Sequence, residues 1–329
     1  MVRIMCSWFL RMTNDPSCPV CRSYSTKTVR HVWDDRYGYP GVFQLSECAQ
    51  CGHGFLSGDF SEQRLRDLYS NFYPRSRLDL ESHRPYEEVS GLGAWIAGEN
   101  ASPFRWVPPN VRVLDIGCGF GESLGYYQAR GCDAYGVEAD ENIRRVAERY
   151  GYKVHVGLFD PSLYEPDSFD FVTMGQVIEH VRDPLETLRG VARILKPGGR
   201  AILSTPNRRG WGARLFGARW AHWHAPYHLQ FFSPRSMELS AQQAGLVLED
   251  SRTVTPSAWL VFQWMHLVTR PREGRRSDFW VHTGEISRNQ RTASRIASLA
   301  SRLKINDLIT RAADFLNIGD NRLFFLRKA

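Results

Sequence analysis

The sequence predicts an α/β protein in which helices cover both faces of a seven-stranded, mostly parallel sheet. Short apolar, β-branched runs alternate with helix-compatible segments through residues 111–252, which is typical of a doubly wound sheet. Turns that contain glycine or proline separate these segments. Two cysteine pairs mark a small module before them, and a basic segment separates the last strand from the other six.

The N-terminal module, residues 13–57, is expected to be a zinc ribbon. Two C-x-x-C turns each present two thiolates, and two such turns brought together make a tetrahedral site for zinc. Four cysteines complete the coordination shell, so this zinc should be structural and not catalytic. His53 is a possible substitute ligand. Disulfides are not expected in a cytoplasmic enzyme, and a redox-active C-x-x-C pair would not need two copies. The four expected ligands are Cys18, Cys21, Cys48 and Cys51.

Residues 58–107 are expected to form a helical connector or cap. Ser61 is a suitable N-cap for a helix with an apolar face. Tyr69, Phe72 and Tyr73 are aromatic side chains that either cap a cofactor pocket or pack in the core, and core packing is slightly favoured. Pro108 and Pro109 then mark entry into the core domain, residues 108–252.

Within this core, strands and helices follow each other regularly. Lys196 to Gly199 is a helix stop and turn signal, and Ser233-Pro234 is an N-cap followed by proline at the first helical position. The expected strands are 111–115, 134–138, 153–157, 169–174, 200–205 and 246–252, followed by 321–326 within the final segment 318–329. The expected helices are 121–130, 140–150, 184–195 and 233–244.

The first strand ends in a glycine-rich turn with the spacing D-x-G-x-G-x-G, from Asp115 to Gly121. This differs from the G-x-G-x-x-G spacing of dinucleotide sites. The second strand ends in Glu138, where a carboxylate can bind a ribose diol. With this spacing the chain resembles the class I S-adenosylmethionine-dependent methyltransferases, which implies a Rossmann-like fold and S-adenosylmethionine as cofactor. The glycines assigned to the cofactor are Gly117, Gly119 and Gly121.

Further segments extend the resemblance over residues 111–250. Glu179-His180-Val181, the turn at 195–199 and the Thr205-Pro206-Asn207 segment are close to motifs of many small-molecule methyltransferases. Leu158 and Phe159 follow the third strand, where an apolar group either stacks on adenine or packs in the core. The resemblance also implies that residues 253–317 are an insertion before an antiparallel last strand. The predicted cofactor-binding residues are Asp115, Gly117, Gly119, Gly121, Glu138, Leu158, Phe159 and Gln176.

Glu179, His180 and His228 are the candidate catalytic residues. His228 lies in a segment rich in histidine and aromatic residues, 220–232, and is the preferred acid/base because imidazole titrates near neutrality; a capping or packing role is equally compatible with its position. Quinone O-methyltransferases resembling this core carry a glutamate where Gln176 stands. Losing that carboxylate disfavours a hard cation, so no catalytic magnesium is expected.

These features predict a methyltransferase that acts on an oxygen or carbon of a small-molecule or glycosidic acceptor. Ribbon-bearing sugar C-methyltransferases resemble this chain. The alternatives are a zinc-ribbon rRNA methyltransferase, with which the net charge of +7 agrees, and a non-catalytic cofactor-binding protein. Neither the acceptor nor the oligomeric state follows from the sequence.

The segment 253–317 and the start of the chain bear on partners and location. Residues 270–304 carry many more basic than acidic side chains, and 291–316 is helix-compatible. A packed lid or a dimer element is expected in preference to a peripheral membrane contact. The opening residues 1–12 are too short in their apolar part for a signal peptide, and no apolar run is long enough to span a bilayer. A cytoplasmic protein is therefore expected.

Overall fold

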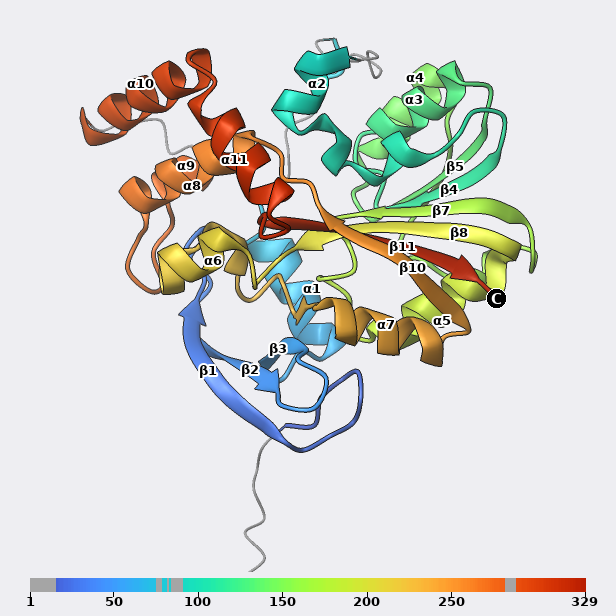
Figure 1. Ribbon diagram of the computed structural model, residues 1–329, viewed down its shortest axis with the longest axis horizontal. Helices are drawn as coiled ribbons and strands as arrows, with labels where there is room; N and C mark the ends of the chain where they lie inside the picture. The colour runs from blue at the N-terminus through green and yellow to red at the C-terminus, as the bar shows by residue number, and fades with distance from the viewer. Residues whose placement is uncertain (1–15, 75–78, 82, 84–90, 282–287) are drawn as a thin grey trace, which may run out of the picture.

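The computed structural model describes residues 16–74, 79–81, 83, 91–281 and 288–329, so the opening residues 1–12 lie outside the described part. A large sheet forms the core, and a smaller four-stranded sheet lies below it (Figure 1). The strands of the large sheet are β4 (Arg112–Ile116), β5 (Asp133–Glu138), β6 (Lys153–Val156), β7 (Phe169–Gly175), β8 (Leu195–Pro206), β10 (Leu246–Thr253) and β11 (Asn321–Lys328).

The large sheet has seven strands in the order β10-β11-β8-β7-β4-β5-β6. The pairs from β8 to β6 are parallel, and β11 is antiparallel to both of its neighbours. Strand β4 lies inside the sheet, and its Val113 and Leu114 have no exposed surface, as expected for a strand covered on both faces. This architecture confirms the predicted doubly wound fold, including the antiparallel last strand.

Helices cover both faces of this sheet (Figure 1). Asp183 and Ser233 cap two of them by accepting hydrogen bonds from backbone N–H groups of Glu186 and Ser236. The turn predicted at 196–199 is part of β8, where the register with β7 shifts, so it is a bulge within the strand. The core helices are α3 (Glu122–Ala129), α4 (Ile143–Tyr150), α5 (Pro184–Ile194) and α7 (Pro234–Gln243).

The smaller sheet joins the cysteine-rich module to the core. Its order is β1-β2-β3-β9, and all of its pairs are antiparallel. Strand β9 (Gln230–Phe231) comes from the segment between β8 and α7, which was not expected to contain a strand. The module therefore contributes three strands of this sheet, and β9 from the core is the fourth. The other strands are β1 (Thr26–Trp33), β2 (Val42–Cys48) and β3 (Gly54–Ser57).

The remaining helices lie before the core, between β8 and β9, and between β10 and β11. The stretch 291–316, which was expected to be helical, belongs to two helices that are separated at Lys304, where the backbone is left-handed with φ of 59°. None of the helices in the described ranges is both long and apolar enough to cross a bilayer. These helices are α1 (Glu62–Asn71), α2 (Gly91–Ala97), α6 (Trp211–Phe216), α8 (Ala258–Thr269), α9 (Asp278–Val281), α10 (Arg288–Arg302) and α11 (Ile305–Phe315).

A buried charge cluster connects the segment after β1 to helix α8. Asp35 is 4% exposed, and its carboxylate lies 3.2 Å from both His266 Nε2 and Arg270 Nε. The Trp280 indole N–H donates to Nδ1 of His266, so Nε2 carries the proton that faces Asp35. Burial opposes ionisation of Asp35, yet His266 and the neighbouring arginines hold its pKa below the ordinary value.

Substituting Asp35 by alanine should therefore destabilise the chain by about 3–5 kcal/mol, since the buried Arg270 would lose its counter-charge and the Nε2–H group of His266 would lose its acceptor. Urea unfolding followed by circular dichroism measures this difference. The exposed Glu148→Ala change on α4 is the control and should stay within about 0.5 kcal/mol of wild type. An equally small effect of Asp35→Ala would show that the cluster contributes little.

Candidate active site

The glycine turn after β4 brings its backbone close to other elements and leaves one side open. Gly117, Gly119 and Gly121 all have positive φ, which side chains other than hydrogen disfavour. A Cβ on Gly117 would collide with Val177, and one on Gly121 would come within 2.7 Å of the Tyr152 ring. A Cβ on Gly119 would meet no atom of the described residues within 4 Å. The open side of the turn thus lies at Gly119, where a ligand can approach the backbone.

Asp115 holds this turn in place from inside. Its carboxylate is 7% exposed and accepts hydrogen bonds from the hydroxyls of Ser123 on α3 and Thr173 on β7. Burial raises the pKa of Asp115 to about 6. Because both oxygens are engaged by protein groups, Asp115 organises the glycine turn, and a direct contact with the cofactor stays a prediction.

Glu138 lies at the end of β5 and reaches back to the glycine turn. One carboxylate oxygen accepts the N–H of Gly119 and the other accepts the N–H of Asp140, each at 2.9 Å. These bonds fix the carboxylate beside the open side of the turn. In this position the carboxylate can accept hydrogen bonds from two ribose hydroxyls, either in addition to the two N–H groups or in place of them.

The other predicted cofactor residues have different surroundings. Leu158 is 82% exposed, whereas the Phe159 ring packs against Gly190 and stacks with Tyr164 in the core. Gln176 has a positive φ and donates from Nε2 to Ser204 Oγ and Asn321 Oδ1, both at 2.9 Å. Its amide therefore links the ends of β8 and β11, and a role of these three residues at the cofactor stays a prediction.

Glu179 is a buried acid in the loop after β7. It has no exposed surface, and neither carboxylate oxygen has a hydrogen-bond partner in the described part of the chain. Burial raises the pKa of Glu179 to about 8, so the acid is mostly neutral at pH 7. Its backbone carbonyl accepts N–H groups from Leu229 and Gln230, which fixes the 220–232 segment beside it.

His180 has one nitrogen engaged and one available. Its Nδ1 lies 3.0 Å from the Tyr227 carbonyl oxygen and 3.2 Å from the Tyr69 hydroxyl. Since a carbonyl only accepts, Nδ1 carries the proton and Nε2 keeps a lone pair. No hydrogen bond to Nε2 occurs among the described residues, and the side chain is half-buried. Desolvation lowers the pKa of His180 to about 4, so its imidazole is neutral at pH 7.

His228 has both nitrogens engaged. Its Nδ1 donates to the His222 carbonyl at 2.9 Å, and its Nε2 lies 3.3 Å from Nδ1 of His224. By the same reasoning His228 Nε2 accepts the proton of His224 Nδ1. Burial lowers the pKa of His228 well below its ordinary value. The ring packs edge-on against His180 at 4.7 Å between centroids.

The structure thus brings the three candidate catalytic residues together. One oxygen of Glu179 and one nitrogen each of His180 and His228 lie within 4.8 Å of one another. Such a group can hold a cation, but the nitrogens of His228 are both used in hydrogen bonds. Gln176 offers only an amide where a further carboxylate would be needed, which disfavours a hard cation such as magnesium.

Two side chains at this site were not expected from the sequence. Arg36 is 7% exposed, donates to the Ala221 carbonyl and lies 3.8 Å from the centre of the Trp280 ring. It forms no ion pair with any described residue, and its charge lowers the pKa of His180. Tyr37 packs edge-on against Tyr227 and His224. The charged and aromatic run from Asp34 to Tyr39, between two strands, was the available signal.

Aromatic residues of the connector complete the site. Tyr69 and Tyr73 lie 5.5 Å and 5.2 Å from the Tyr227 ring. Tyr73 interacts electrostatically with Glu138 as well, so it lies between the acceptor-side rings and the cofactor side. Phe72 instead packs on Tyr39 in the core of the smaller sheet. The connector therefore forms one wall of the site.

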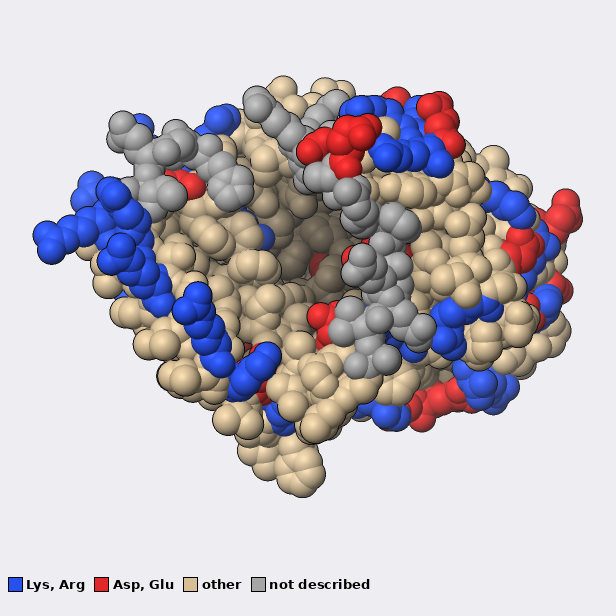
Figure 2. All heavy atoms as spheres, turned by 90° about the horizontal axis from the view of Figure 1, so that it is seen from above, with Lys and Arg blue, Asp and Glu red and all other residues tan. Residues whose placement is uncertain are grey.

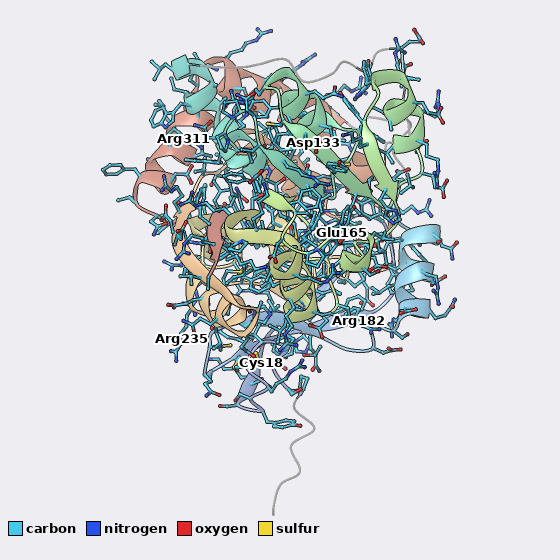
Figure 3. All side chains as sticks on the ribbon, turned by 90° about the vertical axis from the view of Figure 1, so that its right-hand side faces the viewer. Cys18, Asp133, Glu165, Arg182, Arg235 and Arg311 are labelled. Carbon is cyan, nitrogen blue, oxygen red and sulfur yellow. The ribbon has the colours of Figure 1, made fainter. Side chains whose placement is uncertain are left out.

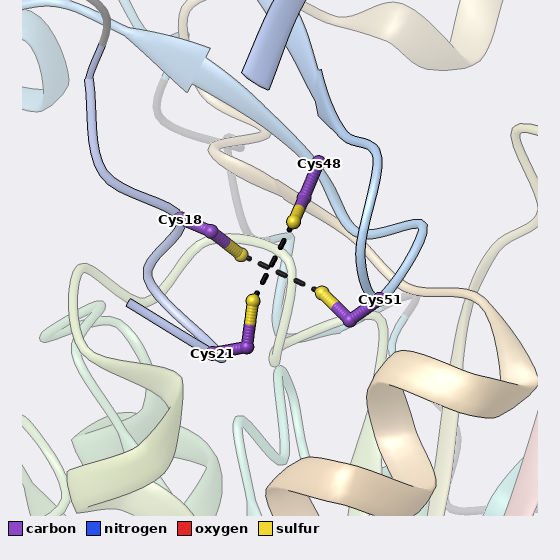
Figure 4. Close-up of side chains that lie close together, drawn as sticks. All are labelled: Cys18, Cys21, Cys48 and Cys51. Atoms are coloured by element: carbon purple, nitrogen blue, oxygen red, sulfur yellow. Dashed lines mark hydrogen bonds between the residues drawn. The ribbon is translucent and has the colours of Figure 1, made fainter. Parts of the chain in front are cut away.

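The four cysteines of the ribbon converge in a separate cluster (Figure 4). Cys18 Sγ lies 3.6 Å from Cys51 Sγ, and Cys21 Sγ lies 3.5 Å from Cys48 Sγ. A tetrahedral zinc site with Zn–S bonds of about 2.3 Å places its sulfurs about 3.8 Å apart, so the donor set fits zinc. The hydrogen bond with Cys51 lowers the pKa of the Cys18 thiol to about 5. His53 faces away and contacts Gln230 Oε1 at 2.9 Å.

A hollow lies on the upper face of the molecule. Figure 2 shows this hollow between the half that carries α8–α11 and the half that carries α3 and α4. Pro206 at the carboxyl end of β8 pairs with Asn321 at the start of β11, next to the helices between β10 and β11. The carboxyl ends of the parallel strands therefore face this hollow, where ligands of doubly wound folds bind.

The sequence is similar to those of known methyltransferases. A family model described as a methyltransferase domain matches residues 63–251. A ubiquinone biosynthesis O-methyltransferase of Xanthomonas euvesicatoria is 32% identical over 164 residues, which cover 45% of this chain and 68% of the relative. One from Aeromonas salmonicida is 29% identical over 187 residues, covering 52% and 76%.

Two solved structures give weaker matches. An S-adenosylmethionine-dependent methyltransferase from Mesorhizobium loti has a TM-score of 0.43 and 17% identity, covering 72% of this chain and 98% of its own. Geranyl diphosphate C-methyltransferase from Streptomyces coelicolor has a TM-score of 0.43 and 14% identity, covering 69% and 76%.

The family match spans more than half of the chain and includes the glycine turn, Glu138 and the loop after β7. It confirms the resemblance on which the cofactor assignment was based. The chain belongs to the methyltransferase domain family and is an S-adenosylmethionine-dependent methyltransferase.

Proposed function

We propose that this enzyme transfers the methyl group of S-adenosylmethionine to an oxygen of a small-molecule acceptor in the hollow. The observation that carries the proposal is the position of His180, whose Nδ1 contacts Tyr69 and Tyr227 and whose ring packs against His228, while no described residue binds its Nε2. A hydroxyl acceptor loses a proton as the new bond forms, so a base at this place is useful. The names of the O-methyltransferase relatives support oxygen over carbon.

In this proposal His180 is the base and His228 is a positioning residue. The lone pair of His180 Nε2 is available, whereas that of His228 is bound by His224. This reverses the preference for His228 that its sequence position suggested. Protonated His180 would lie near Glu179, which is mostly neutral before the reaction, and the new positive charge would favour ionisation of that carboxyl group. The sulfonium is already a strong electrophile, so the enzyme mainly aligns the two reactants.

For the cofactor, we propose that Glu138 binds the ribose hydroxyls and that the backbone near Gly119 faces the rest of the molecule. Asp115 then acts indirectly, through Ser123 and Thr173. The adenine contact is assigned to Leu158 and Phe159, of which Leu158 has the freely exposed surface. S-adenosylmethionine supplies the transferred methyl group.

We further propose that zinc occupies the Cys18, Cys21, Cys48 and Cys51 cluster. Four thiolates fill its coordination shell, so the ion would supply stability and no open position for chemistry. For the domain organisation we keep as a proposal the boundaries expected from the sequence: a ribbon over 13–57, a connector over 58–107, a core over 108–252, an insertion over 253–317 and a final strand over 318–329.

The acceptor class can be tested with the full chain and methyl-labelled S-adenosylmethionine in cell extracts. A labelled small organic product that survives nuclease treatment of the extract supports the proposal, and the ¹³C chemical shift of its labelled methyl group separates oxygen from carbon methylation. Loss of all labelling after RNase would instead favour an RNA acceptor. A labelled sugar would narrow the class to glycosidic acceptors, and a protein that binds the cofactor but labels nothing would be a non-catalytic binder.

Removing the carboxylate of Glu138 should weaken S-adenosylmethionine binding by roughly 10- to 100-fold, as expected for lost hydrogen bonds to a charged group. Isothermal titration of Glu138→Ala measures the change, and Glu138→Gln tests the charge separately. Glu141→Ala changes a neighbouring exposed carboxylate and should bind like wild type. Unchanged affinity of Glu138→Ala would remove the ribose assignment.

Replacing His180 by alanine should lower the turnover of the labelled acceptor by about 100- to 10,000-fold. Cofactor affinity should stay near wild type because His180 contacts Tyr69 and Tyr227. His228→Asn should reduce turnover less. Equal losses for the two variants, or wild-type turnover of His180→Ala, would argue against His180 as the base.

The zinc assignment predicts one bound zinc per chain in the purified protein and its loss in Cys48→Ser. Elemental analysis by mass spectrometry gives the stoichiometry. Cys132→Ser is the matched control because that thiol lies outside the cluster. A metal-free wild-type chain that keeps its stability in the presence of a chelator would exclude a structural zinc.

A further inference from the structure

Helix α11 turns its apolar side outward. The residues at positions 305, 308, 309, 312, 315 and 316 follow the spacing of one helix face, and all are apolar and exposed. Phe315 is 91% exposed and Leu308 is 66% exposed. This stripe consists of Ile305, Leu308, Ile309, Ala312, Phe315 and Leu316.

The side of α11 that faces the protein is mostly polar. Thr310 shares a hydrogen bond with Ser257, and Asp314 accepts from Thr255. Asn306 and Asp307 are buried as well. A surface helix normally has the reverse arrangement, so the outward stripe is not needed for packing within the chain.

Helix α10 continues this surface with basic side chains. Its buried residues Ala297 and Gln290 pack on the inner side, and its outer half carries two kinds of exposed residue. Ile296, Leu299 and Leu303 are 56–64% exposed. Beside them are exposed Arg288, Arg291, Arg295, Arg302 and Lys304, and the described sequence from 288 to 306 contains no acid.

We propose that the outer faces of α10 and α11 form a docking surface for a lipid bilayer with anionic headgroups. Apolar side chains flanked by basic residues suit the boundary between acyl chains and headgroups. A nucleic acid would match the charges but leave the apolar stripe in water. In a symmetric dimer through this face, each cluster of arginines would meet the same cluster of the other copy.

The position of α10 and α11 in the molecule is compatible with docking to a bilayer. Helices α10 and α11 lie at the end of the molecule opposite the ribbon (Figure 1), and the basic side chains border the face with the hollow (Figure 2). Figure 3 likewise shows Arg311 of α11 far from Cys18 and Arg235. A chain docked in this way would have the opening of its active site near the membrane surface, whereas the ribbon would point away.

Co-sedimentation of the full chain with vesicles tests the proposal without any methyl-transfer assay. Wild type should pellet with phosphatidylcholine vesicles that contain phosphatidylglycerol, should pellet less as salt rises, and should stay in solution with phosphatidylcholine alone. Leu308→Glu/Phe315→Glu should abolish pelleting. Arg291→Gln/Arg295→Gln should weaken it roughly thirtyfold, since each basic residue near an anionic surface contributes about 1 kcal/mol.

The matched controls lie at the opposite end of the molecule. Tyr24→Glu replaces a side chain that is 69% exposed, and Lys27→Gln/Arg235→Gln removes two exposed charges; both should pellet like wild type. Circular dichroism melts identify any variant that is misfolded, and the arginine pair remains informative if the leucine and phenylalanine pair is not.

Three results would overturn the proposal. Wild type could stay in solution with anionic vesicles at low salt, or both patch variants could pellet normally. A lipid-free dimer that Leu308→Glu/Phe315→Glu converts to monomer, seen by analytical ultracentrifugation, would assign the surface to a second copy instead.

Discussion

The pairing of β3 with β9 is the contact on which the acceptor side of this enzyme depends. Gly54 and Phe55 of the ribbon pair with Phe231 and Gln230, directly after His228. The Gln230 side chain contacts His53 on one side and donates to the Val181 carbonyl on the other. The ribbon, the histidine-rich segment and the loop after β7 therefore form one hydrogen-bonded unit.

This arrangement places unusual charge properties in the hollow. Burial favours the neutral form of both Glu179 and its histidine neighbours, while Arg36 brings a positive charge without a carboxylate partner among the described residues. The carboxyl and imidazole groups of this site are therefore mainly neutral before an acceptor binds.

The sequence was sufficient for the core because periodicity and turn chemistry are local signals. The alternating strands, the glycine turn and the position of Glu138 follow from such signals, and so do the paired cysteines. Tyr69 was recognised as a pocket residue only as an alternative to core packing. Its contact with His180 joins positions far apart in the sequence, and local patterns do not report such contacts.

Other features depended on tertiary structure in the same way. Strand β9 is only two residues long and exists because β3 offers an edge. His180 keeps one nitrogen without a hydrogen bond to a described residue, whereas both nitrogens of His228 are engaged. This difference follows from the carbonyl and imidazole groups around each ring. The helical character of residues 291–316 was expected from the sequence, but only the fold shows that the apolar side of α11 faces outward.

The most direct test of this account is amide hydrogen exchange, measured by mass spectrometry, in the metal-loaded chain and after removal of metal with a chelator. If the ribbon holds the acceptor segment in place, metal removal should increase exchange in residues 222–232 and 179–181 as well as in the ribbon. Exchange in β4 and β5 should not change. Increased exchange confined to the ribbon, with residues 222–232 still protected, would contradict the account.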